Sequence, residues 1–211
     1  MNICYIIGAL GIDADFSPGN NDFIIAADAG YEHLKRLGIK AHLVVGDFDS
    51  LGNIPQGEHI VRYPVMKDDT DTMIAVKLGF EKGFKTFYIY GGMGGERTDH
   101  TIANIQTLAY IAEKGGEGYI IGRDENITVV KNASLLFSDK MQGRISVFAI
   151  GGCACGVTLE GLLYPLNNAT LTPYSPIGVS NEFTGLRACV KVNKGFLMVM
   201  WSGVFDKPEK L

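Results

Sequence analysis

Cysteine, basic charge and long apolar runs are all in short supply in this sequence of 211 residues. The four cysteines form no Cys-x-x-Cys pair, and no histidine lies near the central two in the sequence, which argues against a zinc site and against a disulfide framework. We therefore expect reduced thiols and a cytoplasmic protein. The cysteines are Cys4, Cys153, Cys155 and Cys189.

The charge balance gives no sign of a nucleic-acid partner. Lysine and arginine number 19 against 23 acidic residues, for a net charge of −4, whereas binders of nucleic acid usually carry a concentrated basic face. The apolar stretch 3–12 has no basic residue before it and runs into Asp13 and Asp15, so we expect a buried strand rather than a signal peptide. No apolar run approaches the ~20 residues of a membrane helix, so no membrane partner is expected.

The N-terminal part, residues 1–125, alternates short apolar runs with helical patterns. This alternation is typical of βα units and predicts an α/β, Rossmann-like domain, a mostly parallel sheet with flanking helices. Apolar side chains recur at helical spacing most clearly in 99–113. The predicted strands are 2–8, 23–27, 42–46, 59–63, 86–90 and 118–122, and the predicted helices lie near 29–37, 70–82 and 99–113.

The C-terminal part, residues 126–211, has a different pattern. Short β-type runs are separated by Gly, Asn, Pro or Ser, and no long amphipathic helix is evident. This pattern predicts an all-β domain, an antiparallel sandwich or barrel, of which we expect the sandwich.

Acidic residues follow two of the predicted strands, where ligands bind in open α/β sheets. Asp28 comes directly after 23–27, although a helix cap would explain it as well. Asp47 and Asp49, in "VVGDFDSLG", stand at i and i+2 on a loop, where both carboxylates can reach a hard divalent cation. An Asx turn would also explain this pair.

Two further polar clusters begin helices. In "KDDTD", Asp68, Asp69 and Asp71 favour the helix dipole but repel one another unless a cation or a basic group compensates them. In "YGGMGGERTDH", a glycine-rich turn leads into a helix and carries Arg97, an arrangement suited to phosphate, although a surface turn is the alternative. Taken together, the four clusters indicate a divalent metal that holds a polyphosphate, with Arg97 neutralising developing charge.

The motifs "AADAG", "GDFDS", "KDDTD" and "GGMGGERTDH", in this order and followed by "GVSNEFTG" at 178–185, resemble the thiamine pyrophosphokinase family over essentially the whole chain. The resemblance implies an α/β ATP-binding and catalytic domain in 1–125 and a β-sandwich domain in 126–211 that binds thiamine and forms a homodimer. It also implies transfer of pyrophosphate from ATP to the hydroxyethyl group of thiamine, with Mg²⁺, giving thiamine diphosphate and AMP.

The same resemblance assigns roles to individual residues. Asp28 corresponds to an acid near the reacting hydroxyl, and Thr70 lies near nucleotide or substrate. Ser180 and Asn181, with Glu182 in the same segment, correspond to the thiamine pocket at the subunit interface. The carboxylates that hold Mg²⁺ and the triphosphate correspond to Asp47, Asp49 and Asp71, and the Arg-x-Asp pair after the glycine loop, with Arg97 towards the phosphates of ATP, corresponds to Arg97 and Asp99.

Some positions stay open. The first motif has Asp-Ala-Gly where Asp-Gly-Gly is frequent, and His100 receives no role. Trp201 and Phe183 are both candidates for an aromatic that stacks on thiamine, but we expect either to pack in the core.

Two other functions compete with this one. A metal-dependent Asp-x-Asp nucleotide-sugar transferase would explain Asp47 and Asp49, but it would explain neither "KDDTD" nor the glycine loop with Arg97. A non-catalytic metal-nucleotide sensor would have little need for so many carboxylates.

Overall fold

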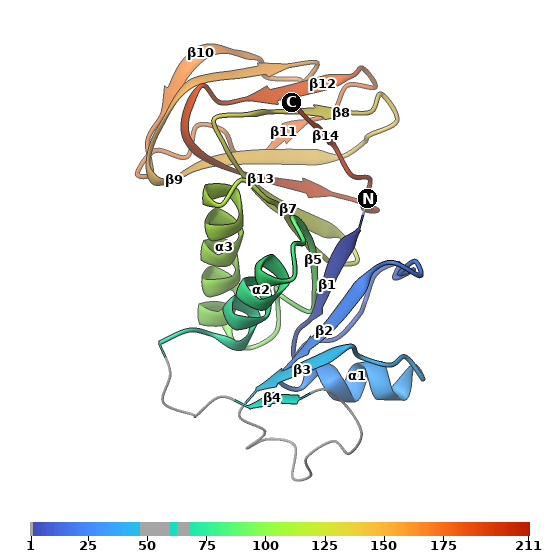
Figure 1. Ribbon diagram of the computed structural model, residues 1–211. Coiled ribbons are helices and arrows are strands. Elements are labelled where there is room, and N and C mark those ends of the chain that lie inside the picture. Colours follow the sequence, from blue (N-terminus) through green and yellow to red (C-terminus); the bar gives the residue numbers. More distant parts are fainter. Residues whose placement is uncertain (1, 47–59, 63–67) are drawn as a thin grey trace. The chain divides into compact units, whose positions relative to one another are not determined.

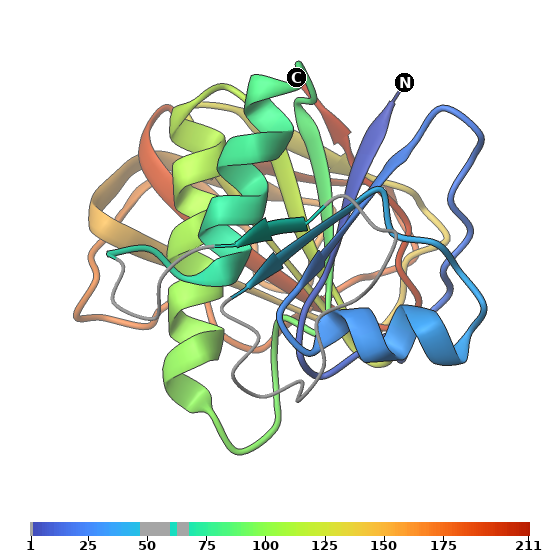
Figure 2. The same ribbon diagram turned by 60° about the horizontal axis from the view of Figure 1, so that its bottom comes forward.

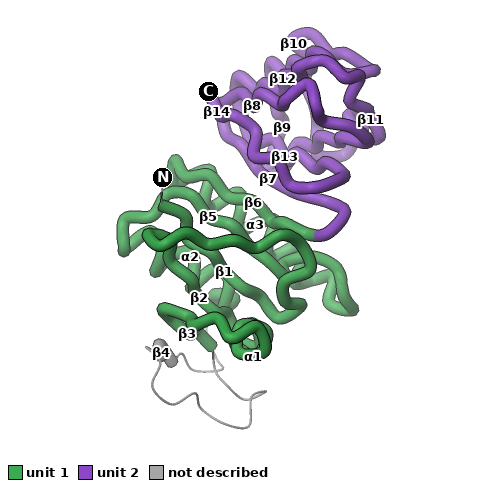
Figure 3. The backbone as a smooth tube through the Cα atoms, turned by 90° about the vertical axis from the view of Figure 1, so that its right-hand side faces the viewer, with its two compact units in different colours: residues 1–122 green, residues 123–211 purple. Residues whose placement is uncertain are grey.

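The computed structural model describes residues 2–46, 60–62 and 68–211. Asp47 and Asp49 therefore lie outside the described residues. The chain divides into two compact units, Met1–Gly122 and Arg123–Leu211 (Figure 3).

The described strands of unit 1 form a parallel sheet in the order β6-β5-β1-β2-β3-β4 (Figure 1). Its strands are near-continuous apolar runs because a parallel sheet is buried on both faces. Each one begins and ends within one residue of its predicted bounds. The strands are β1 (Ile3–Ile7), β2 (Phe23–Ala27), β3 (Leu43–Gly46), β4 (Ile60–Arg62), β5 (Thr86–Tyr90) and β6 (Glu117–Ile121).

The strand order reverses between β1 and β5. From β1 the chain adds β2, β3 and β4 outward on one side, then returns to the other side of β1 with β5 and β6. The loops that leave β1 and β5 therefore run in opposite directions. In open α/β sheets, the crevice at such a reversal is where ligands bind.

Three helices accompany this sheet at the predicted places: α1 (Gly30–Arg36), α2 (Asp71–Glu81) and α3 (Thr98–Glu113). Helices α2 and α3 pack side by side, whereas α1 contacts β1 and β2 and lies apart from them (Figure 2). Gly79 explains how closely α2 approaches β5, because a Cβ there would lie 2.5 Å from the ring of Phe87.

Unit 2 is built from antiparallel strands in the order β14-β8-β12-β9-β13-β7, with β10 and β11 also paired to β9. Residues 123–211, all of which the structure describes, contain no helix. The strands are β7 (Glu125–Lys131), β8 (Ser134–Phe137), β9 (Arg144–Glu160), β10 (Leu166–Leu171), β11 (Asn181–Glu182), β12 (Ala188–Lys191), β13 (Lys194–Ser202) and β14 (Glu209–Lys210).

Strand β9 differs from the expected pattern. Among the short β-type runs of this half, residues 144–150 and 157–166 are separated by glycines and resemble two strands in the sequence, but Arg144–Glu160 is one strand. Gly151, Gly152 and Gly156 have positive φ angles, so the chain bends there while its pairing with β13 and β10 continues on either side. Glycine bends this strand without ending it.

The two aromatics considered for stacking on thiamine are both in the core of unit 2, as expected. Trp201 is 1% exposed and contacts Phe137 edge-on, with ring centroids 5.4 Å apart. Phe183 is 9% exposed and packs against the same Phe137.

Candidate active site

A cavity of about 390 Å³ opens in unit 1 at the carboxyl ends of β1, β2 and β5. This is the reversal point of the sheet, the place where the strand order predicts a ligand site. Four segments line it: residues 8–10 after β1, residues 27–28 at the end of β2, residues 70–72 at the start of α2, and parts of 91–104, which hold the glycine loop and the first turns of α3.

Asp28 is held at this cavity by an unusual backbone. Its φ angle is +49°, in the left-handed region, where an L-residue is disfavoured by roughly 1 kcal/mol. Its N–H donates to the carbonyl of Val45 at 2.8 Å. Two residues on, a Cβ at Gly30 would lie 1.9 Å from the carbonyl oxygen of Ile7, so only glycine lets α1 begin so close to β1.

Asp28 is not the N-cap residue of α1. That position is Ala29, which makes no side-chain cap hydrogen bond. A strained acid that lines a cavity is instead a candidate for function.

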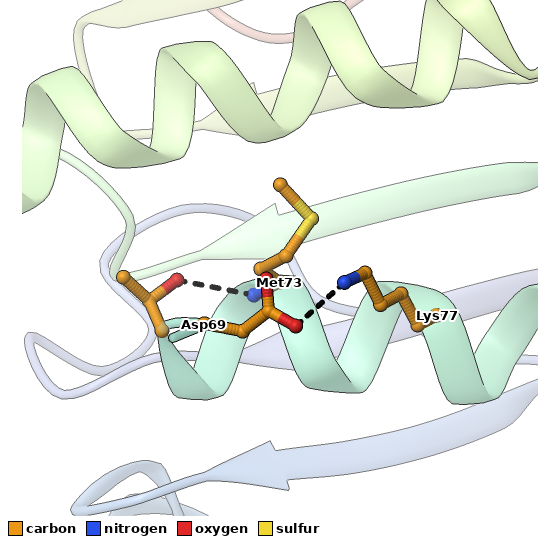
Figure 4. A network of polar contacts seen from close by, with 4 residues as sticks. Asp69, Met73 and Lys77 are labelled. Atoms are coloured by element: carbon orange, nitrogen blue, oxygen red, sulfur yellow. Dashed lines mark hydrogen bonds and ion pairs between the residues drawn. The ribbon is translucent and has the colours of Figure 1, made fainter. Parts of the chain in front are cut away.

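At the start of α2, Asp69 and Asp71 of "KDDTD" have different contacts. Thr70 is the N-cap, and its hydroxyl accepts from the N–H of Met73 at 3.2 Å. Asp69 forms an ion pair of 2.5 Å with Lys77, two turns along α2 (Figure 4). Asp71, the first residue of the helix, lines the cavity together with Thr70.

Lys77 thus supplies a basic group of the kind that the acids of "KDDTD" require. Its pKa is raised, mainly by the hydrogen bond to Asp69. The carboxylate of Asp69 is engaged along the helix, which leaves Asp71 as the acid of this run at the cavity.

Arg97 and Asp99 form a two-pronged pair at the start of α3. Nε of Arg97 donates to Oδ1 of Asp99 at 2.9 Å, and Nη2 donates to Oδ2 at 2.7 Å. The hydrogen bond from Arg97 lowers the pKa of Asp99 to about 2, so this carboxylate is ionised at neutral pH. Arg97 lines the cavity, and Asp99 fixes the plane of its guanidinium from the side.

Sequence reasoning missed other residues that line the cavity, above all on α3. His100, Thr101 and Asn104 follow Arg97 at spacings of three, four and seven, so all four share one face of the helix. The signal was present in the sequence as a polar stripe next to apolar positions of the same helix.

The segment expected to bind thiamine lies in unit 2. Ser180 has a φ angle of +59°, and its N–H donates to the hydroxyl of Ser146 at 3.0 Å. The side chain of Asn181, 4% exposed, accepts from the N–H of Tyr164 at 2.9 Å and donates to its carbonyl at 2.7 Å. It also accepts from the N–H of Glu182 at 2.9 Å.

The side chain of Asn181 therefore holds the backbone of Tyr164 with a donor and an acceptor bond, as the backbone of a neighbouring strand would. The side chain of Tyr164 is 62% exposed, unlike those of Trp201 and Phe183. This tyrosine is an accessible aromatic in contact with the segment, and sequence reasoning did not consider it.

The structure brings part of the expected set together. Asp28, Thr70, Asp71 and Arg97 line one cavity, with Asp99 bonded to Arg97. Among residues 2–46, 60–62 and 68–211, no group of three or more His, Cys, Asp or Glu side chains is placed to hold a metal ion. The expected metal set includes Asp47 and Asp49, which that range leaves out.

Two protein-family models match this chain. Residues 18–120 match the model described as thiamin pyrophosphokinase, catalytic domain, and residues 127–197 match the one described as thiamin pyrophosphokinase, vitamin B1 binding domain. The matches define an enzyme with a catalytic domain followed by a vitamin-binding domain. The chain belongs to the thiamin pyrophosphokinase family, which confirms the resemblance found in its motifs.

Individual relatives agree. The thiamine pyrophosphokinase of Bacillus subtilis (strain 168) is 29% identical over 187 residues, which are 84% of this chain and 86% of that protein. A crystal structure of thiamine pyrophosphokinase from Bacillus subtilis superposes with a TM-score of 0.80 at 25% identity, covering 97% of this chain and 100% of the other. Yeast thiamin pyrophosphokinase shares the fold, with a TM-score of 0.74 at 15% identity, covering 96% of this chain and 86% of the other.

These likenesses confirm the expected fold class as an α/β fold with parallel and antiparallel strands and few helices. In the described part of the chain, no helix combines the length and the apolar character needed to cross a membrane.

Proposed function

We propose that this chain transfers the pyrophosphoryl group of ATP to the hydroxyethyl group of thiamine, giving thiamine diphosphate and AMP. One observation carries the proposal. Two carboxylates, Asp28 and Asp71, meet Arg97 and a glycine loop at the reversal point of a parallel sheet, in a chain of the thiamin pyrophosphokinase family.

The reaction is an in-line displacement at the β-phosphorus. The hydroxyl oxygen of thiamine forms a bond to this phosphorus while the bond to the oxygen shared with the α-phosphate breaks, and AMP leaves with that oxygen. Positioning and charge neutralisation supply most of the rate in such transfers. Arg97 offers its remaining N–H groups to the phosphates, Thr70 lies beside them, and Asp28 takes the proton of the hydroxyl late in the reaction.

A divalent metal fits the residues at this site. Kinases of this type generally need one, and a hard cation such as Mg²⁺ prefers carboxylate oxygens like that of Asp71 at the cavity. We assign Mg²⁺ to Asp47, Asp49 and Asp71. When bound, it would neutralise charge on the phosphate chain.

In this proposal the two domains have different functions. Residues 1–125, which we assign as a Rossmann-like domain, bind ATP, and residues 126–211, assigned as a β-sandwich, bind thiamine and pair into a homodimer. Ser180 and Glu182 are assigned to the thiamine pocket at the subunit interface, and Asn181 acts there by holding Tyr164.

Exposed apolar side chains of unit 2 support the homodimer, since such surface usually marks an interface. Each of the following is at least 43% exposed: Leu163, Tyr164, Tyr174, Ile177, Val179 and Leu186.

A cytoplasmic location belongs to the same proposal. Its support is the free state of Cys153, which is exposed, because reduced surface thiols are typical of reducing compartments.

The deciding experiment incubates the protein with ATP, Mg²⁺ and thiamine and separates the products chromatographically. Equal amounts of AMP and thiamine diphosphate are expected, and neither should form when thiamine is left out. Release of a nucleoside diphosphate from a sugar donor, or ATP binding without consumption, would contradict the proposal.

A further inference from the structure

The glycine loop between β5 and α3 has a backbone that can adopt many conformations, yet the proposed function requires it to bind the phosphate chain of ATP. Gly91, Gly94 and Gly95 all have positive φ angles, between 64° and 85°. Glycine loses more conformational freedom on ordering than any other residue. A loop of this composition binds a phosphate chain well only if something else has already fixed its conformation.

Asn104 fixes one end of this loop. It lies two turns into α3, is 7% exposed, and lines the cavity. Its Nδ2 donates to the carbonyl oxygen of the buried Gly92 at 2.7 Å, and this bond is itself buried. A carbonyl engaged in this way does not turn its negative end towards an anion in the same cavity.

Thr101 fixes the next part of the loop. Its hydroxyl oxygen accepts from the N–H of Gly94 at 3.2 Å. Thr101 and Asn104 both lie on the α3 face that carries Arg97, so the helix that presents the cation also holds the loop.

We infer that Asn104 and Thr101 are positioning residues for the triphosphate of ATP, because they hold the loop 91–95 in one conformation before the nucleotide binds. The inference rests on the proposed function and adds residues that touch the loop rather than the reacting atoms. It predicts that their loss weakens the use of ATP and leaves the use of thiamine unchanged.

The test compares variants by steady-state kinetics and by hydrogen–deuterium exchange of the peptide that covers 91–97, without nucleotide. Asn104→Ala and Thr101→Val each remove one bond to the loop, so the KM for ATP is expected to rise roughly 5- to 10-fold. Exchange in the loop peptide should become faster, and the KM for thiamine should stay the same. Thr101→Ser keeps the acceptor oxygen and should restore most of the ATP affinity.

Thr107→Val is the matched control. Thr107 is fully buried on the same helix, but its hydroxyl donates to Ala103 within α3, so neither kinetics nor loop exchange should change. Wild-type ATP kinetics together with wild-type loop exchange in Asn104→Ala and Thr101→Val would overturn the inference. If Asn104→Ala does not fold, the Thr101→Val and Thr101→Ser pair decides alone.

The proposed function can fail separately. In that case the wild-type protein makes no thiamine diphosphate. The inference is then tested by measuring the ATP affinity of the wild type and the variants by calorimetry, together with hydrogen–deuterium exchange of the loop peptide. Unchanged ATP affinity and exchange in the variants would overturn it, and the losses described above would support it.

Discussion

At the scale of single residues, neighbouring aspartates with the same chemistry have different surroundings. Asp69 is paired with Lys77 along α2, whereas Asp71 lines the cavity. We expect Asp71→Asn to lower kcat about 100-fold, a loss typical of removing a charge that acts on the transition state. Asp69→Asn, the matched control, should keep both kcat and Mg²⁺ dependence close to wild type. Equal losses in both variants, measured by AMP release across a Mg²⁺ titration, would contradict this ranking.

The thiols should differ in reactivity for an equally local reason. Burial raises the pKa of the Cys4 thiol to about 12, and its side chain is fully inaccessible, whereas Cys153 is exposed. Alkylation requires the thiolate, and a raised pKa keeps Cys4 protonated well above neutral pH. Iodoacetamide at pH 8 should therefore label Cys153 and spare Cys4, as read by peptide mass spectrometry. Labelling of Cys4 in the native protein at that pH would show that β1 is not packed as described.

At the scale of elements, strands and helices were most predictable from the sequence where burial of apolar side chains alone determines the local structure. The strands of unit 1 were predictable because burial on both faces demands short apolar runs, and the helices because one apolar stripe must meet the sheet. Strand β9 was not, since its glycines bend a continuous strand and resemble strand ends.

The candidate site was also predictable only in part. The motifs indicated its residue types and their places at strand ends, but they did not indicate the contacts between side chain and backbone. The bonds of Asn104 to Gly92 and of Asn181 to Tyr164 depend on how separate segments meet, which spacing along the chain does not encode.

The Asn181 contact leads to a prediction about the 162–164 segment. Asn181→Ala would leave the part-buried N–H and carbonyl of Tyr164 without these partners, so we expect a stability loss of about 2 kcal/mol in urea unfolding. The KM for thiamine should rise, as in Tyr164→Ala, while the KM for ATP stays the same.

Thr184→Ala is the control for that experiment. It removes a bond of 2.9 Å from the Thr184 hydroxyl to the Gly161 carbonyl, which joins nearby parts of the same two segments. Thiamine kinetics should not respond to it. A thiamine KM that rises equally in Thr184→Ala and Asn181→Ala would mean that the segment needs general rigidity rather than a placed Tyr164.

At the scale of the whole molecule, the exposed apolar side chains of unit 2 predict self-association. Light scattering should give twice the 22.9 kDa of one chain. Ile177→Glu and Leu186→Glu each place a charge on a side chain that is 58% or 63% exposed in one chain, and burying that charge in an interface is costly. Both variants should dissociate at concentrations where the wild type stays paired. Leu37→Glu, at a 56% exposed leucine of unit 1, should not.

Thiamine turnover measured at different protein concentrations tests whether the thiamine pocket lies at the interface of the dimer. If the pocket lies at the subunit interface, thiamine turnover in the two glutamate variants should fall on dilution in parallel with the dimer fraction, while binding of ATP to unit 1 persists. The physical reason is that a shared pocket exists only in the pair, whereas the cavity between β1 and β5 is built by one chain. A wild-type monomer with full activity would exclude a shared pocket and would require another partner for the apolar surface of unit 2.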